Sequence, residues 1–180
     1  MYMDDLKLSD LKDEHRMVAE VIGLENYMEL CRSFGGNFVC IPGRYHLYRN
    51  YYTRKILADK GKHSNKELAK LYPVSKSTIY NIQKSADKHV TTDTADKLVI
   101  QDLAAPLQDI AELIGFETFL VLCKAYESSQ LYIPTVKEAT RKYVERKIIE
   151  NKDIFSKREL TRIYGLSAST IYNILKKQEN

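Results

Sequence analysis

The sequence predicts a mainly α-helical protein of two tandem helical units, each with one short β-strand and a C-terminal helix-turn-helix. Two observations predict this fold class. The chain repeats itself at a fixed offset of 92 residues, and 29 of the 75 positions in residues 10–84 are identical to their partners without a gap. Within each copy, apolar residues recur at helical spacing except in one short run that favours a strand.

The repeat defines the expected domain boundaries. A linker is predicted at residues 85–97, which are polar and show no apolar periodicity. The other parts are a first unit at residues 1–84, with helices and a strand over 8–43 and a helix-turn-helix over 44–84, and a second unit at residues 98–180, with the same parts over 98–135 and 136–177.

Each copy begins with two amphipathic helices joined at a glycine, Gly23 or Gly115. In the second copy, the apolar residues of the first helix share one face: Leu103, Leu107, Ile110, Ala111 and Ile114. The second helix carries Phe119, Leu120, Leu122, Cys123 and Tyr126, matched in the first copy by Tyr27, Met28, Leu30, Cys31 and Phe34. Two such helices leave apolar faces open to water, so we expect the other copy to cover them.

A short strand is predicted next, within residues 34–42 and 126–134. Both runs are rich in β-prone residues and end at a proline, which cannot donate a hydrogen bond to a sheet. A single strand leaves its backbone unpaired, so we expect the two copies to pair antiparallel about a pseudo-twofold axis. The alternative is an ordinary extended loop.

A third helix is predicted after each proline, at residues 45–60 and 137–152, and a shorter helix follows it. The shorter helix opens with a capping box, Ser64 with Glu67 and Ser156 with Glu159, in which the hydroxyl and the carboxylate each bond a backbone amide at the helix start.

The end of each copy has the pattern of a helix-turn-helix. In the first copy the shorter helix breaks at Pro73, and Ser75 caps a second helix that carries Ile79 and Ile82 inward. The second copy repeats this pattern with Gly165, Ser167, Ile171 and Ile174. A sharp turn followed by inward branched residues is typical of a DNA-binding helix-turn-helix.

Charge alternates with the repeat in a way that favours a polyanionic partner. The net charge is −4 over residues 1–43, +8 over 44–84, −5 over 85–135 and +6 over 136–177. Both basic segments contain the helix-turn-helix pattern, as a DNA-binding surface carried twice requires. The alternative is an uneven distribution of solvated charges.

Composition narrows the remaining classes. The three cysteines have no metal-ligand spacing, so we expect buried reduced thiols, no metal site and no cofactor. We find neither a run of about 18 apolar residues nor the layout of a signal peptide, and expect a cytoplasmic protein that does not contact membranes. No nucleophile, base or phosphate-loop spacing accompanies the four histidines, so we do not expect an enzyme.

Each unit resembles the Mor/C family of phage middle- and late-gene transcription activators. The matching features are Gly23 and Gly115, the Gly35-Gly36 pair, the Ile-Pro that ends each strand, and the run ELxxxYxxSxxxIYxI from Glu67 and from Glu159. The resemblance covers about residues 10–84 and 102–176. It implies intertwined dimerisation helices, a two-stranded ribbon and C-terminal helix-turn-helix units. Family members are ordinarily homodimers of one unit, so this chain resembles a single-chain pseudo-dimer.

The face of each second helix opposite the isoleucines is the predicted DNA contact. It presents Ser75, Lys76, Ser77, Tyr80, Asn81 and Lys84 in the first copy and Ser167, Ser169, Tyr172, Asn173 and Lys176 in the second. Asparagine can bond adenine through two atoms, serine suits base edges or phosphates, and lysine suits phosphates. For the tyrosines, packing within the domain is an equal alternative. Weaker candidates for backbone contacts are Arg54, Lys55, Arg146 and Lys147, for which a solvated helix face is the alternative.

The sequence therefore predicts a regulator, expected to be an activator, that binds an imperfect inverted repeat of double-stranded DNA, with RNA polymerase as a candidate partner. The inequality of Lys76 and Ala168 is the reason to expect an imperfect repeat. Two alternatives stay open. One is a DNA-architectural or recombination accessory protein of a mobile element. The other is a protein-interaction module whose second helix-turn-helix has lost DNA contact.

Overall fold

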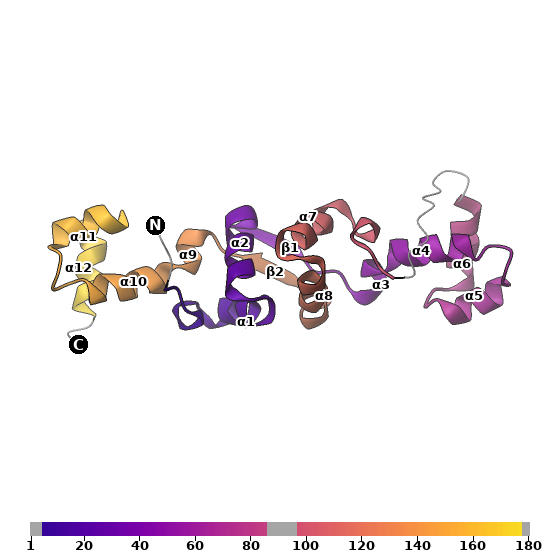
Figure 1. The fold of residues 1–180 in the computed structure, drawn as a ribbon, viewed down its shortest axis with the longest axis horizontal. Helices are drawn as coiled ribbons and strands as arrows, with labels where there is room; N and C mark the ends of the chain where they lie inside the picture. Colours follow the sequence, from indigo (N-terminus) through magenta and orange to yellow (C-terminus); the bar gives the residue numbers. More distant parts are fainter. Residues whose placement is uncertain (1–4, 86–96, 178–180) are drawn as a thin grey trace. The chain divides into compact units, whose positions relative to one another are not determined.

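The structure, a computed structural model, describes residues 5–85 and 97–177. Most of the predicted linker lies outside these residues. The described chain is mainly helical with one small sheet (Figure 1), which confirms the predicted fold class. No helix in the described part of the chain has both the length and the apolar character that crossing a bilayer demands.

The elements follow the repeat closely. The first copy contains the 3₁₀ turn η1 (Leu8–Asp10), then α1 (Asp13–Ile22), α2 (Leu24–Phe34), β1 (Asn37–Cys40), α3 (Arg44–Leu47), α4 (Arg49–Ala58), α5 (Asn65–Leu71) and α6 (Lys76–Ser85). The second contains η3 (Ile100–Asp102), then α7 (Ala105–Ile114), α8 (Phe116–Ala125), β2 (Gln130–Ile133), α9 (Val136–Ala139), α10 (Arg141–Glu150), α11 (Lys157–Tyr164) and α12 (Ala168–Lys176).

Two compact units divide the chain, and neither coincides with one repeat. Unit 1 combines Met1–Asn37 with Tyr132–Asn180, and unit 2 is Phe38–Leu131. In unit 1, α9 therefore packs against α2, although more than one hundred residues separate them in the sequence (Figure 1). Each unit joins the N-terminal helices of one copy to the helix-turn-helix of the other.

A glycine turn joins the two N-terminal helices of each copy, as predicted. Gly23 has φ 86° and Gly115 has φ 85°, a conformation that side chains rarely tolerate. The turn lets α1 pack against α2 in unit 1 and α7 against α8 in unit 2. Their apolar faces are buried, including Tyr27 and Phe119, whose side chains are 1% and 0% exposed.

The two predicted strands pair antiparallel in a two-stranded sheet. The Gly36 amide donates to the Ile133 carbonyl at 2.7 Å, and the Ile41 amide donates to the Ser129 carbonyl at 2.8 Å. Ser128, which takes the place of Gly36 in the second copy, has φ 60°. The strand is therefore kept although the glycine is replaced.

The structure divides the single helix predicted after each proline into two helices. The prediction is wrong in this respect. Tyr48 has φ −94° and ψ 2°, and Thr140 has φ −92° and ψ 8°. The Thr140 hydroxyl donates to the Val136 carbonyl at 2.7 Å, a kind of bond that often bends a helix. Each copy thus has a one-turn helix before the longer α4 or α10.

Two of the three cysteines meet the expectation of buried thiols. Cys31 and Cys123 are buried, and burial raises the pKa of Cys31 to about 11 and that of Cys123 to about 12. Cys40 is exposed, because it lies in the strand β1, most of whose side chains face solvent. All three are free thiols.

Candidate nucleic-acid interface

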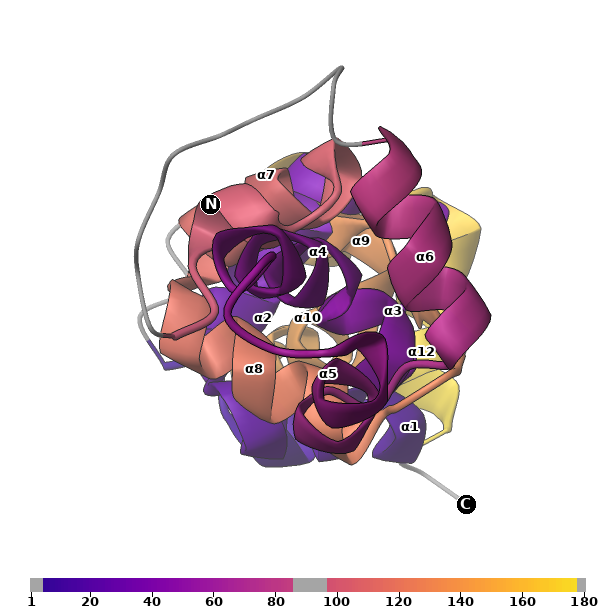
Figure 2. The same ribbon diagram turned by 90° about the vertical axis from the view of Figure 1, so that its right-hand side faces the viewer.

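The first helix-turn-helix forms around three fully buried side chains in unit 2. Ile56 of α4, Leu68 of α5 and Ile79 of α6 are each 0% exposed and make one apolar cluster. Partly buried residues surround it, Ile82 among them. Figure 2 looks onto these three helices. Because one face of α6 is held in this cluster, its opposite face is left to solvent.

The second helix-turn-helix, in unit 1, repeats this arrangement. Ile148 of α10, Leu160 of α11 and Ile171 of α12 are each 0% exposed, and Ile174 joins them at 8%. Every core position of the first cluster has its partner 92 residues later. The second helix of each motif, α6 or α12, is the predicted recognition helix, and both are therefore held in the same way.

The turns between the paired helices differ in geometry. Tyr72 ends α5 in an extended conformation with ψ 138°, as the residue before a proline favours. Gly165 ends α11 in the left-handed region with φ 63°. Both turns are supported by a tyrosine hydroxyl. The Tyr72 hydroxyl donates to the Asp59 carboxylate at 2.7 Å, and the Tyr164 hydroxyl accepts from the side-chain amide of Asn151 at 3.1 Å.

Both predicted capping boxes are present. The Ser64 amide donates to Glu67 at 2.8 Å while the Ser64 hydroxyl accepts from the Glu67 amide, and Ser156 pairs with Glu159 in the same way. Hydrogen bonds from Ser64 lower the pKa of Glu67, and those from Ser156 lower the pKa of Glu159. The carboxylates therefore stay ionised at the helix starts, where a negative charge is favourable.

A cluster of hydroxyls lies at the start of each recognition helix. The Ser75 oxygen accepts from the Thr78 amide at 3.1 Å and lies 2.8 Å from the hydroxyls of Ser77 and Thr78. Ser167 has the same contacts with Ser169 and Thr170. Such a polar, amide-rich helix start suits a phosphate group. Sequence reasoning found the serines and missed the threonines, although the repeated Ser-x-Ser-Thr run gave a signal.

All the predicted recognition residues lie on the solvent-exposed side of their helices. The exposed set is Ser75, Lys76, Ser77, Tyr80, Asn81 and Lys84 on the α6 side and Ser167, Ser169, Tyr172, Asn173 and Lys176 on the α12 side. Tyr80 is 57% exposed and Tyr172 is 51% exposed. The tyrosines are thus outside both cores, and their rings are accessible.

A further cation accompanies the second recognition helix. The Lys157 ammonium lies 5.4 Å from the centre of the Tyr172 ring, and that of Lys176 lies 5.9 Å from it. Such contacts between an ammonium and an aromatic ring are attractive. The first copy has Asn65 in place of Lys157, so this cation belongs to unit 1 alone. Sequence reasoning missed Lys157, because its contact with α12 depends on how the two helices cross.

The weaker candidates for DNA backbone contact have other partners. The Arg54 side chain is 6% exposed and forms an ion pair with Asp102, with N and O 2.8 Å apart. Arg146 pairs with Asp10 at 2.7 Å, and Lys147 pairs with Asp5 and Glu150. These acidic partners raise the pKa values of Arg146 and Lys147. The charges of Arg54, Arg146 and Lys147 are therefore paired within the protein, and Lys55 is partly buried. We do not propose these four residues as DNA contacts.

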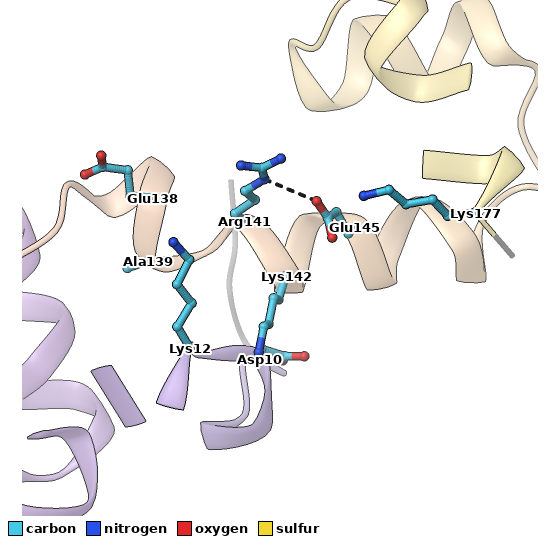
Figure 3. Close-up of a pocket in the computed structure, with 8 residues that line it drawn as sticks. All are labelled: Asp10, Lys12, Glu138, Ala139, Arg141, Lys142, Glu145 and Lys177. Carbon is cyan, nitrogen blue, oxygen red and sulfur yellow. Dashed lines mark hydrogen bonds and ion pairs between the residues drawn. The ribbon is translucent and has the colours of Figure 1, made fainter. Parts of the chain in front are cut away.

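A hollow of about 240 Å³ in unit 1 is lined by charged side chains from η1, α9 and α10 and by Lys177 (Figure 3). Its acidic groups already have partners. Arg141 donates to Glu145 at 3.2 Å, Asp10 pairs with Arg146, and Glu138 accepts from the Thr135 amide at 2.8 Å. The carboxylates of the hollow are therefore already bonded within the protein, and the hollow does not have the features of a ligand pocket.

Comparisons with known proteins bear on this interface. The model of the Mor transcription activator family matches the chain twice, at residues 5–98 and at residues 90–180. A search of curated proteins and a search of solved structures found no match.

Proposed function

The chain belongs to the Mor transcription activator family, and from this premise we propose that it binds one double-stranded DNA site through both of its helix-turn-helix units. The two family matches correspond to two tandem copies of one unit. The chain would act as a single-chain pseudo-dimer. This family is one of transcription activators and not of enzymes.

One observation carries the proposal. The two recognition helices expose the same serines, tyrosine, asparagine and C-terminal lysine while burying the same isoleucine in a helix-turn-helix core. In such motifs the exposed face of the second helix contacts base edges in the major groove. Two recognition helices on one pseudo-dimer would occupy major grooves about one helical turn apart, ~34 Å, or a multiple of it.

Each side chain has a proposed role. Asn81 and Asn173 would bond adenine through two atoms, and Ser77 and Ser169 would contact base edges or phosphates. The remaining members of the set would contact the backbone or flanking bases: Ser75, Lys76, Tyr80, Lys84, Ser167, Tyr172 and Lys176. Since the two helices differ at Lys76 and Ala168, the proposed site is an imperfect inverted repeat.

Binding by one chain can be tested directly. DNA selected by the protein from a random pool would be footprinted, and the mass of the complex would give the number of chains per duplex. We expect one chain to protect both half-sites, with an affinity that falls steeply as salt rises. Two chains per duplex, each protecting one half-site, would contradict the pseudo-dimer.

Regulation needs a separate test, with RNA polymerase as the proposed protein partner. Transcription from the selected site would be measured in a purified system with and without the protein. An increase that depends on both half-sites is expected. DNA bending without any change in transcription would instead favour an architectural role.

A further inference from the structure

The helix that begins each helix-turn-helix core contacts a turn of the other repeat. In unit 2, α4 of the first copy contacts η3 of the second. In unit 1, α10 of the second copy contacts η1 of the first. The exchange is therefore reciprocal, and the same chemistry makes both contacts.

In unit 2 the contact is a buried ion pair with two hydrogen bonds. The Arg54 guanidinium donates to the two Asp102 carboxylate oxygens, from Nε at 3.2 Å and from Nη2 at 2.8 Å. The two side chains are 6% and 7% exposed. The side-chain amide of Asn50 also donates to the backbone carbonyl of Asp102 at 2.9 Å. Asp102 is thus held through both its side chain and its backbone.

In unit 1 the equivalent residues form the same pair. Arg146 donates to the two Asp10 oxygens, from Nε at 2.9 Å and from Nη2 at 2.7 Å. Each arginine also lies over a tyrosine ring of its own helix, at 5.4 Å for Tyr51 and 5.3 Å for Tyr143. The same geometry occurs twice, 92 residues apart, so we do not regard either contact as accidental.

Each arginine shares its helix with a core residue of the helix-turn-helix. Arg54 and Ile56 are two positions apart on α4, so their side chains leave the helix about 200° apart. Ile56 lies in the cluster that holds α6, while Arg54 binds Asp102. One short helix therefore connects the recognition helix with the turn of the other repeat. Arg146 and Ile148 do the same on α10.

We infer that Arg54 and Arg146 are positioning residues that fix each recognition helix to the N-terminal turn of the other repeat. The sequence alone would allow Arg54 to pair with Asp10 and Arg146 with Asp102, because the copies carry the same residues at these positions. The structure assigns the opposite choice. A bidentate pair suits this task in unit 2, because displacing Asp102 would leave the buried Arg54 guanidinium without its carboxylate. The pairing itself does not depend on the proposed function, whereas its consequence for DNA does.

A double-mutant cycle in the full chain tests the choice of partner. Arg54→Gln and Asp102→Asn would be made singly and together, and the opening of α4 and α6 would be followed by amide hydrogen exchange. We expect each single change to raise the opening constant at least about tenfold and the double change to raise it by much less than the product. The same cycle with Asp10→Asn in place of Asp102→Asn should be additive to within about twofold.

Two further variants keep the test decisive. If Arg54→Gln does not fold, Arg54→Lys keeps the charge and removes the bidentate geometry, and the same cycles apply. Arg49→Ala removes an exposed arginine of α4 and is the matched control, for which no coupling with Asp102 is expected. Coupling of Arg54 with Asp10, or no coupling with either aspartate, would overturn the assignment.

The DNA readout separates positioning from simple stability. On duplexes whose two half-sites are moved apart in single base-pair steps, the native chain should prefer one spacing. We expect Arg54→Gln to weaken that preference at least about tenfold while the affinity for an isolated half-site stays within about twofold. An unchanged spacing preference beside a positive cycle would leave Arg54 with a structural role only and refute positioning. If the native chain binds no DNA, the proposed function fails and the cycle still decides the pairing.

Discussion

Replacing Ile79 with alanine should open the first helix-turn-helix without unfolding the rest of the protein. Ile79 is fully buried, in a cluster with only two other fully buried residues, Ile56 and Leu68. Ile79→Ala removes three carbon groups worth about 0.8 kcal/mol each in transfer and also leaves a cavity, so about 3 kcal/mol is expected. That is on the order of a 100-fold change in the local opening constant.

Amide hydrogen exchange would show where the protein opens. We expect α5 and α6 to lose protection in Ile79→Ala, while α1 and α2, which belong to unit 1, keep theirs. Binding to the half-site read by α6 should weaken in parallel. The control is Leu71→Ala on α5, where the side chain is 58% exposed and a change within about 0.5 kcal/mol is expected. Native protection of α6 in Ile79→Ala would refute the idea that this cluster holds the recognition helix.

Three further predictions concern DNA readout and pH. Asn81→Ala and Asn173→Ala should each relax base discrimination in one half-site, by about 1–3 kcal/mol, which selection from random DNA would show; unchanged base preferences in both variants would exclude direct readout. Lys157→Asn should weaken only the half-site read by α12 and lower the salt slope by about one, measured by titration at several salt concentrations; an equal loss at both half-sites would count against it. Acid should weaken the ion pairs that Arg146 and Lys147 of α10 form with Asp5 and Asp10 in unit 1. The hydrogen bond from Lys147 lowers the pKa of Asp5 from 3.8 to about 2. The pair with Arg146 likewise lowers the pKa of Asp10. This stabilisation is therefore complete above the ordinary carboxyl pKa and is lost as pH falls from about 4 towards 2. Melting curves across that range should depend less on pH in Asp5→Asn, and an identical dependence would contradict the assignment.

Local features of the fold could be predicted from the sequence because their causes are local. Capping boxes, glycine turns and apolar spacing each act within a few residues, so the helices and both strands were found. The division of the third helix was missed. Nothing in apolar spacing distinguishes Tyr48 or Thr140 from the residues around them, and the Thr140 hydroxyl bond became visible only in the structure.

The pairing between copies could not be predicted, because the repeat makes the partners chemically equal. Asp10 and Asp102 are each followed by a leucine, and Arg54 and Arg146 each begin an Arg-Lys-Ile run. Only the three-dimensional arrangement shows which carboxylate each arginine meets. The recognition faces were easier to find, since inward isoleucines fix which side of α6 and α12 is exposed. Lys157 was missed because it lies on a different helix from Tyr172.

The exchanged pairs constrain how the two halves of the chain can differ. A change at Asp102 acts on the helix-turn-helix of the first copy through Arg54, so neither half of that ion pair can change alone without leaving a buried charge. The aligned positions Lys76 and Ala168 are both exposed and have no such constraint. Neither does the position at which the partly buried Asn65 aligns with the exposed Lys157. A homodimer of one unit would carry each change at both of its half-sites. Joining the copies in one chain removes that symmetry from the recognition faces, while the ion pairs that anchor both recognition helices stay the same.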